Sequence, residues 1–80
     1  MLISVRSLES GVVLEGDAVS LNIKTTSGEI TVLDAHRPLM SVLKTCTASV
    51  LKKDGTKQEF IVNGGFLEVN RKNQVLVLVD

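Results

Sequence analysis

The sequence predicts an all-β fold, a flattened antiparallel β-sandwich of about eight to ten short strands that forms one domain over residues 1–80. Three observations support this fold class. Apolar and polar residues alternate along several short segments, turn residues separate these segments at short intervals, and a helical apolar spacing does not persist beyond two turns. The exception is residues 39–44, which fit either a strand or a short helix.

The predicted strands follow from alternation with a period of two residues. Val, Ile and Thr, whose branched side chains fit a pleated surface, are frequent in them. Each strand of a small sandwich is expected to bury one face and expose the other, and Val19, Leu21 and Ile23 alternate with polar residues in this way. The clearest strands are residues 19–24, 29–32, 58–62 and 74–79.

Turn residues separate the predicted strands. Asp-Gly and Asn-Gly pairs supply the positive φ angles that tight hairpins need. The basic pairs Lys52-Lys53 and Arg71-Lys72 belong to hairpin turns, where we expect solvated tips that also discourage edge-to-edge aggregation. The predicted turns are residues 15–17, 25–28, 53–56, 63–65 and 70–73.

Residues 39–43 and 75–79 carry more apolar side chains than one buried face of a thin sandwich accommodates. Either Met40 and Val42, or Leu76 and Leu78, should therefore face outward, where a contiguous apolar patch usually marks a protein contact. The alternative is that loops fold over these side chains. The sequence thus favours a surface that another protein covers.

Composition excludes several classes of function. Nine basic and nine acidic residues give no net charge, and Phe60 and Phe66 are the only aromatic residues, so nucleic acid is not expected as a partner. Cys46 is the only cysteine and is expected to be a small buried or edge hydrophobe that forms no disulfide within the chain. The N-terminus does not resemble a signal peptide, and no stretch approaches the ~20 apolar residues of a membrane span.

Catalytic and metal-binding patterns are not found. A thiol hydrolase would need Cys46 activated by His36 and oriented by a group such as Asp34, but these residues have no recognised spacing. One His and one Cys among scattered carboxylates do not match a metal site, and Gly64-Gly65 opens a strand rather than a phosphate-binding helix. We therefore predict no catalytic, cofactor-binding or metal-binding residue.

The segment His36-Arg37-Pro38 is predicted to form a stiff loop. Pro38 has a fixed φ and biases Arg37 toward an extended conformation. Such a loop would present Glu29, His36 and Arg37 on a rigid edge, which lowers the ordering cost of binding a partner. A loop that only closes the fold is the alternative.

Several short motifs follow one another in a fixed order along the chain. The order is Gly28, Glu29, Leu33, His36, Pro38 and Leu39, then an Asp54-Gly55 hairpin, then Gly64 to Val69, and then a final Val-Leu-Val-Asp strand. With these motifs, nearly all of the chain resembles the N-terminal β-sandwich domain of the epsilon subunit of F-type ATP synthase, called delta in mitochondria.

The chain departs from the common family pattern at five residues. Thr31 and Val32 replace a common glycine and isoleucine, Asp34-Ala35 replaces a common Pro-Gly, and Arg37 replaces a common Ala. The chain also stops after the last strand, so we expect the C-terminal helical domain of most members to be absent. Inhibition by such helices would then be unavailable to it.

The resemblance implies a non-catalytic rotor subunit that couples proton-driven rotation to ATP synthesis. It implies contact with the gamma subunit and the ring of c subunits, indirect contact with the alpha3beta3 head, and a peripheral place at the cytoplasmic face of the inner (plasma) membrane. By position, Glu29 would approach the c ring. The residues toward gamma would be His36, Pro38, Leu39, Met40 and Ser41. A free-standing adaptor sandwich is the alternative.

Overall fold

The computed structural model describes residues 1–80 and contains eight strands and no helix. This confirms the predicted all-β class, and residues 39–44, which the sequence left open between strand and helix, contribute the strand β4. The strands are β1 (Leu2–Ser7), β2 (Gly11–Thr25), β3 (Gly28–Leu33), β4 (Leu39–Leu43), β5 (Cys46–Lys52), β6 (Lys57–Val62), β7 (Gly65–Val69) and β8 (Gln74–Val79).

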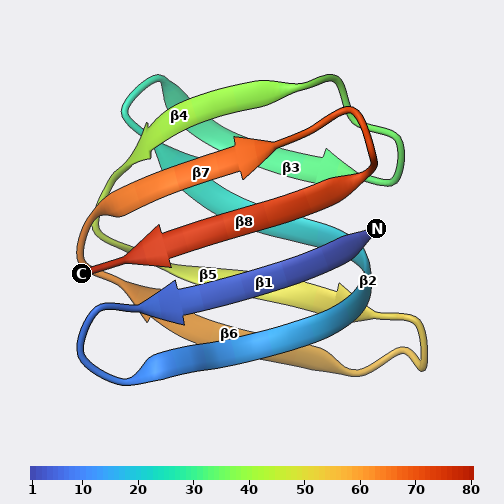
Figure 1. The fold of residues 1–80 in the computed structure, drawn as a ribbon, viewed down its shortest axis with the longest axis horizontal. Coiled ribbons are helices and arrows are strands. Elements are labelled where there is room, and N and C mark those ends of the chain that lie inside the picture. Colours follow the sequence, from blue (N-terminus) through green and yellow to red (C-terminus); the bar gives the residue numbers. More distant parts are fainter.

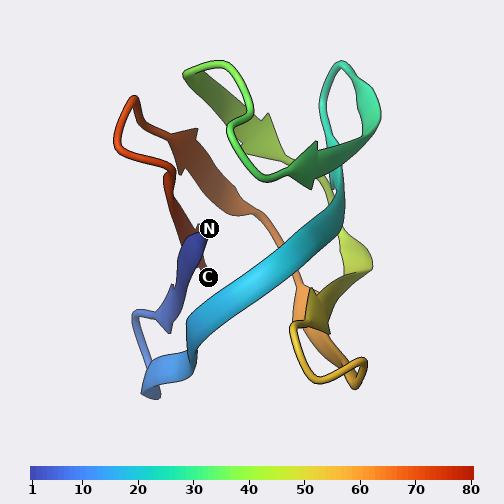
Figure 2. The same cartoon turned by 90° about the vertical axis from the view of Figure 1, so that its right-hand side faces the viewer.

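The strands form two packed layers that share β2 (Figures 1 and 2). The first part of β2 pairs with β1, and the layer continues through β8 and β7 to β4. The second part of β2 pairs with β3 on one side and β5 on the other, and β5 pairs with β6. Figure 2 shows β2 running diagonally from one layer to the other.

The pairings are antiparallel except for β1 with β8, which is parallel, with Leu2 opposite Gln74 and Ser7 opposite Val79. These two strands come from opposite ends of the chain, so no hairpin signal in the sequence announces their pairing. Because β1 begins the chain, β8 ends it and the two run parallel, the N- and C-termini lie at opposite ends of this strand pair (Figure 1).

The prediction of a turn at residues 15–17 is wrong. These residues lie inside β2, and the chain reverses earlier, at residues 8–10. Gly16 has a φ of 144°, which an L side chain rarely adopts, so here glycine permits a change of direction within a strand instead of a hairpin. The other predicted turns lie between strands, as expected.

The core contains 18 buried hydrophobic residues between the two layers. Leu21 and Ile23 point into it as predicted, but Val19 is 42% exposed. The pairing of β2 with β5 shifts register between Ala18 and Ser20, so Ala18 replaces Val19 on the inner side. Val19 is therefore the one apolar residue of this segment that alternation misplaces.

Thr25 is the only buried polar residue, and both of its hydrogen-bonding capacities are used. Its Oγ1 donates to the carbonyl of Gly28 at 2.9 Å and accepts from the Ser27 amide at 3.1 Å. No buried side-chain polar atom in the molecule lacks a partner. The β2–β3 turn is thus held by hydrogen bonds to Thr25, the buried last residue of β2.

Candidate docking surface

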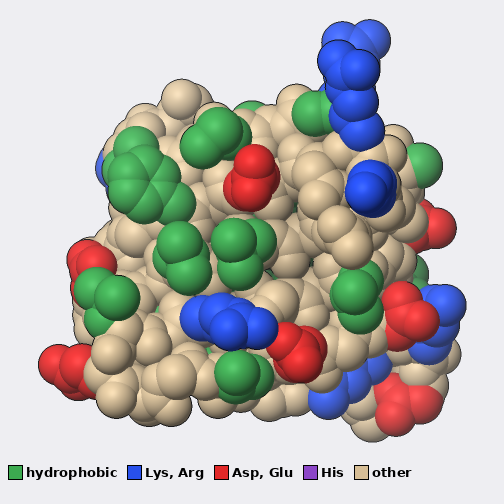
Figure 3. Space-filling view, viewed as in Figure 1, with side chains coloured by type: hydrophobic (Ala, Val, Ile, Leu, Met, Phe, Trp, Pro, Cys, Tyr) green, Lys and Arg blue, Asp and Glu red, His purple; other side chains and the backbone are tan.

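Five apolar side chains gather on the outward side of β4, β7 and β8, and we call them the outer face. Met40 is 72% exposed, and Leu76 is half-buried. Figure 3 shows hydrophobic side chains collected over these strands. The outer face consists of Met40, Val42, Phe66, Leu76 and Leu78.

The strand register places these side chains in two rows across the layer. Val42 lies opposite Phe66, which lies opposite Leu78 on its other side. Directly opposed residues point to the same side of a sheet, so the three form one continuous apolar row. In the second row Met40 and Leu76 flank Glu68. One carboxylate therefore interrupts an otherwise apolar surface.

The expected outward exposure of Met40 and Val42, or of Leu76 and Leu78, is confirmed. Both strands contribute: Met40, Val42 and Leu78 are exposed and Leu76 is half-buried. Their exposure shows that no loop covers them. β7 lies between β4 and β8 and places Phe66 at the centre of the same surface. The sequence analysis did not assign Phe66 to this face: the period of two residues along β7 opposes Phe66 to Leu67, but only the strand order places β7 here.

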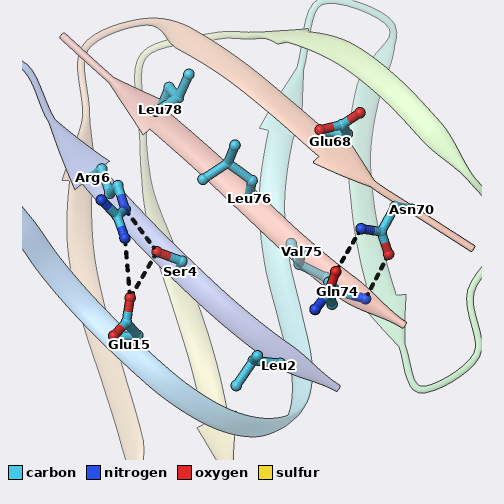
Figure 4. A pocket seen from close by; sticks show the side chains of 10 residues that line it. All are labelled: Leu2, Ser4, Arg6, Glu15, Glu68, Asn70, Gln74, Val75, Leu76 and Leu78. Carbon is cyan, nitrogen blue, oxygen red and sulfur yellow. Dashed lines mark hydrogen bonds and ion pairs between the residues drawn. The ribbon is translucent and has the colours of Figure 1, made fainter. Parts of the chain in front are cut away.

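Several shallow grooves lie on or beside the outer face, and two of them are larger than the others. One, of about 650 Å³, runs beside the β1–β2 turn and is lined by Leu8, Val12, Phe66 and Leu78 among others. The other, of about 490 Å³, crosses β1, β8 and β7 and has Leu76 between its two polar banks (Figure 4). The apolar surface therefore continues into a groove on each of two sides.

Polar side chains line both sides of the second groove, and all but one of the charged ones are paired within the chain (Figure 4). On β1 and β2, Arg6 donates to Ser4 at 3.1 Å and pairs with Glu15 at 3.4 Å. At the other end the Asn70 amide donates to Gln74 at 2.8 Å. The carboxylate of Glu68 has no ion pair and no hydrogen bond within the chain.

The three residues of β4 that the resemblance assigned to gamma do not share one side of the strand. Met40 points outward. Leu39 and Ser41 lie opposite the buried residues Val69 and Leu67, which places them on the inner side, and both are half-buried. Only Met40 of these three is presented to a partner that covers the outer face.

His36 and Pro38 lie in the loop between β3 and β4. Pro38 is exposed, His36 is half-buried, and the His36 Nδ1 is 2.8 Å from the carbonyl oxygen of Arg37. Ala35, the second residue of this loop, has a φ of 59°, which is in the left-handed region. It lies at the other end of β3 from Glu29, which is exposed and faces Lys24 across the β2–β3 hairpin (Figure 1).

Asn73 is a structural residue of this loop that the sequence analysis missed. Its side chain accepts a hydrogen bond from the Ala35 amide at 2.8 Å and donates to Asp34 Oδ1 at 2.6 Å. The Met1 ammonium donates to the same oxygen at 2.6 Å, and these two bonds, the ammonium first, hold the pKa of Asp34 below its usual value. Asn73 has a φ of 60°, a conformation that Asn tolerates, and this was the available signal.

The residues considered for catalysis or metal binding do not form a reactive cluster. Cys46 is half-buried at the start of β5 and packs against the core. No three His, Cys, Asp or Glu side chains come together in a way that would hold a metal ion. None of the elements is a helix able to cross a membrane.

Comparison with known proteins gives one family. A family model described as the ATP synthase, Delta/Epsilon chain, beta-sandwich domain matches residues 5–80. An ATP synthase epsilon chain from Cutibacterium acnes is 29% identical over 68 residues, which cover 85% of this chain. The match covers 47% of that relative, so the chain spans about half of its length.

Two solved structures share the fold. A chain of the Euglena gracilis mitochondrial ATP synthase superposes with a TM-score of 0.91 at 22% identity, over 99% of this chain and 49% of that one. A chain of the Tetrahymena thermophila mitochondrial ATP synthase central stalk and c ring gives 0.81 at 17% identity, over 99% of this chain and 62% of that one.

Proposed function

The chain belongs to the ATP synthase delta/epsilon β-sandwich family, and on that premise we propose that it is a non-catalytic central-stalk subunit of an F-type ATP synthase. In this role it binds the gamma subunit and the c ring, and through them it couples proton-driven rotation to ATP synthesis in the alpha3beta3 head. Its place is peripheral, at the cytoplasmic face of the inner (plasma) membrane, and it reaches the membrane only through the complex.

The observation that carries the proposal is the uncovered outer face. Met40, Val42, Phe66 and Leu78 are each more than two-fifths exposed and lie on neighbouring strands. A contiguous apolar surface of this kind marks a protein contact in a soluble domain. We assign it to gamma, with Met40 as a contact residue and His36 and Pro38 at the adjoining end of the β3–β4 loop.

Glu29 is assigned to the c ring. It lies at the start of β3, whereas the loop with His36 follows the end of β3, so the two groups are at opposite ends of one strand (Figure 1). This separation supports contact with two different neighbours. Leu39 and Ser41 would act by supporting β4 from the inner side.

Replacement of Met40 by Asp tests the outer face. The charge would be buried without a partner in the complex, so we expect the affinity for purified gamma to fall at least about 30-fold. The isolated chain should remain folded, with its free energy of unfolding changed by less than about 0.5 kcal/mol, because Met40 is exposed. Affinity is measured by titration with gamma and stability by denaturant unfolding.

Ile61→Asp is the matched control. Ile61 is 70% exposed, nearly as much as Met40, but it lies on β6 in the other layer. It should leave gamma binding within about twofold. Equal loss in both variants would contradict the assignment of this face, and a chain that binds other proteins but not gamma would favour the free-standing adaptor.

A further inference from the structure

Glu68 is the feature of the outer face that an apolar contact alone does not explain. It lies on β7 between Met40 and Leu76, with Phe66 on the same side of its strand. Its carboxylate has no partner within the chain. The other acidic residue that lines the same groove, Glu15, is in contrast already paired with Arg6.

The partners of the neighbouring polar groups explain why Glu68 stays unpaired. Arg6 is on β1, and β8 with Leu76 separates it from β7 (Figure 4). Its guanidinium turns to Ser4 and Glu15 on its own side. Asn70 and Gln74 are bonded to each other on the remaining side. No cation of this chain therefore reaches the carboxylate.

A partner that covers the outer face removes this carboxylate from water. A buried charge without a counter-charge is costly, and buried charges in proteins are paired or hydrogen-bonded. From this we infer that the docked subunit places one Arg or Lys side chain in the groove between β7 and β1, with its aliphatic stem on Leu76 and its cationic head on Glu68. The inference rests on the proposed function, and it names the chemistry of the partner at that site.

The inference gives Glu68 a defined role in selecting a partner. The rows around it attract any apolar surface, whereas the carboxylate penalises every surface that lacks a cation at this position. The groove of about 490 Å³ leaves room for a long side chain beside Leu76. An apolar surface without such a residue would bind less well than its area suggests.

Glu68→Leu tests the sign of this effect. If a cation faces Glu68, leucine leaves that cation buried and unpaired, and the affinity for purified gamma falls about 30-fold. If an apolar group faces Glu68, leucine extends the apolar rows and the affinity stays equal or rises, which would overturn the inference. Glu68→Gln, which keeps the shape but removes the charge, should lower affinity about 10-fold.

Glu59→Gln is the matched control. Glu59 is an exposed and unpaired carboxylate on β6 of the other layer, and its replacement should leave affinity within about twofold. Glu68→Lys should abolish binding, and one basic residue of gamma changed to Glu should restore it. If no such reversal in gamma restores binding, the inference fails.

The Met40→Asp variant separates the two claims. If Met40→Asp loses binding while Glu68→Leu keeps or gains it, the outer face is the interface and only the inferred cation is wrong. If Met40→Asp binds as the unchanged chain does, the proposed use of the outer face is wrong, and the role of Glu68 is overturned with it.

Discussion

Asp34 connects three segments that are far apart in the sequence. One of its oxygens accepts from the Met1 ammonium and from the Asn73 amide, both at 2.6 Å. The other end of the Asn73 amide accepts from Ala35. The β3–β4 loop is thereby tied to the β7–β8 turn and to the beginning of β1. This network, together with Pro38, limits the freedom of the loop before any partner binds.

The lowered pKa of Asp34 predicts an acid-sensitive contribution to stability. A carboxyl whose pKa is lower in the folded state than in the unfolded state stabilises the fold above its unfolded pKa of about 4, and this contribution is lost as pH falls through the lowered value. Asp34→Asn should therefore be less stable than the unchanged chain at pH 7, and the difference should shrink below pH 4. Denaturant unfolding at pH 7 and at pH 3 measures both.

Glu9→Gln serves as the control for Asp34→Asn, since the Glu9 side chain forms no ion pair and lies in the exposed β1–β2 turn. Its stability should follow that of the unchanged chain at both pH values. An Asp34→Asn variant whose deficit is the same at pH 3 and pH 7 would show that the ionised carboxylate is not what stabilises the loop.

At the scale of elements, β7 and β8 leave no room for a side chain at Gly65. A Cβ at this position would lie 1.8 Å from the carbonyl oxygen of Leu78, and the φ of 134° is itself unfavourable for other residues. The close contact and the positive φ both require glycine at this position, which belongs to the Gly64-Gly65 pair that the sequence analysis placed at a turn. Glycine here lets two strands of the outer face pair without a gap.

Gly65→Ala should destabilise the fold by about 3 kcal/mol, because β7 and β8 must separate to admit the methyl group. Gly16→Ala is the control: its φ of 144° is equally unfavourable, but no atom lies within 4 Å of the added Cβ. We expect about 1 kcal/mol there, from backbone strain alone. Equal losses in chemical unfolding would show that conformation, not the close approach, requires Gly65.

Local alternation was sufficient to find most strands but not to connect them. It located β3, β6 and β8 because each is short, regular and bounded by turn residues. It failed at residues 15–17, where a glycine bends β2 without ending it, and at Val19, where a register shift exchanges the two faces. Both failures arise in the strand that belongs to two layers, and tertiary pairing decides its course.

At the scale of the whole molecule, the two sides of β8 have different roles. Val77 is fully buried and lies between Val5 of β1 and Leu67 of β7. Leu78, the next residue, is 44% exposed on the outer face. The inner side of the strand therefore stabilises the fold, while the outer side remains available to a partner.

Val77→Ala should lower the free energy of unfolding by about 2 to 3 kcal/mol, since it leaves a cavity between packed strands. Leu78→Ala removes more atoms but should cost less than about 1 kcal/mol, because its side chain is only partly removed from water. The two variants are compared by denaturant unfolding. A larger loss for Leu78→Ala would mean that the outer face is part of the core.

The sequence predicted the residues that β4 and β8 contribute to the outer face, but not those of β7. The excess of apolar residues in β4 and β8 showed that some side chains had to face outward. The sequence did not show that β7 lies between these strands, so the contributions of Phe66 and Glu68 became visible only in the register. The split of Leu39 and Ser41 from Met40 follows from the pleat once β4 is known to be a strand.

The passage of β2 through both layers has a mechanical consequence. Layers held together only by side chains would slide over one another under shear, since such contacts have little directionality. Here a continuous backbone joins them at Gly16 to Ala18, and hydrogen-bonded neighbours flank it on each side of the crossing. A tangential load applied to one layer is therefore carried to the other by covalent bonds, which suits the proposed role of a subunit that turns with a shaft.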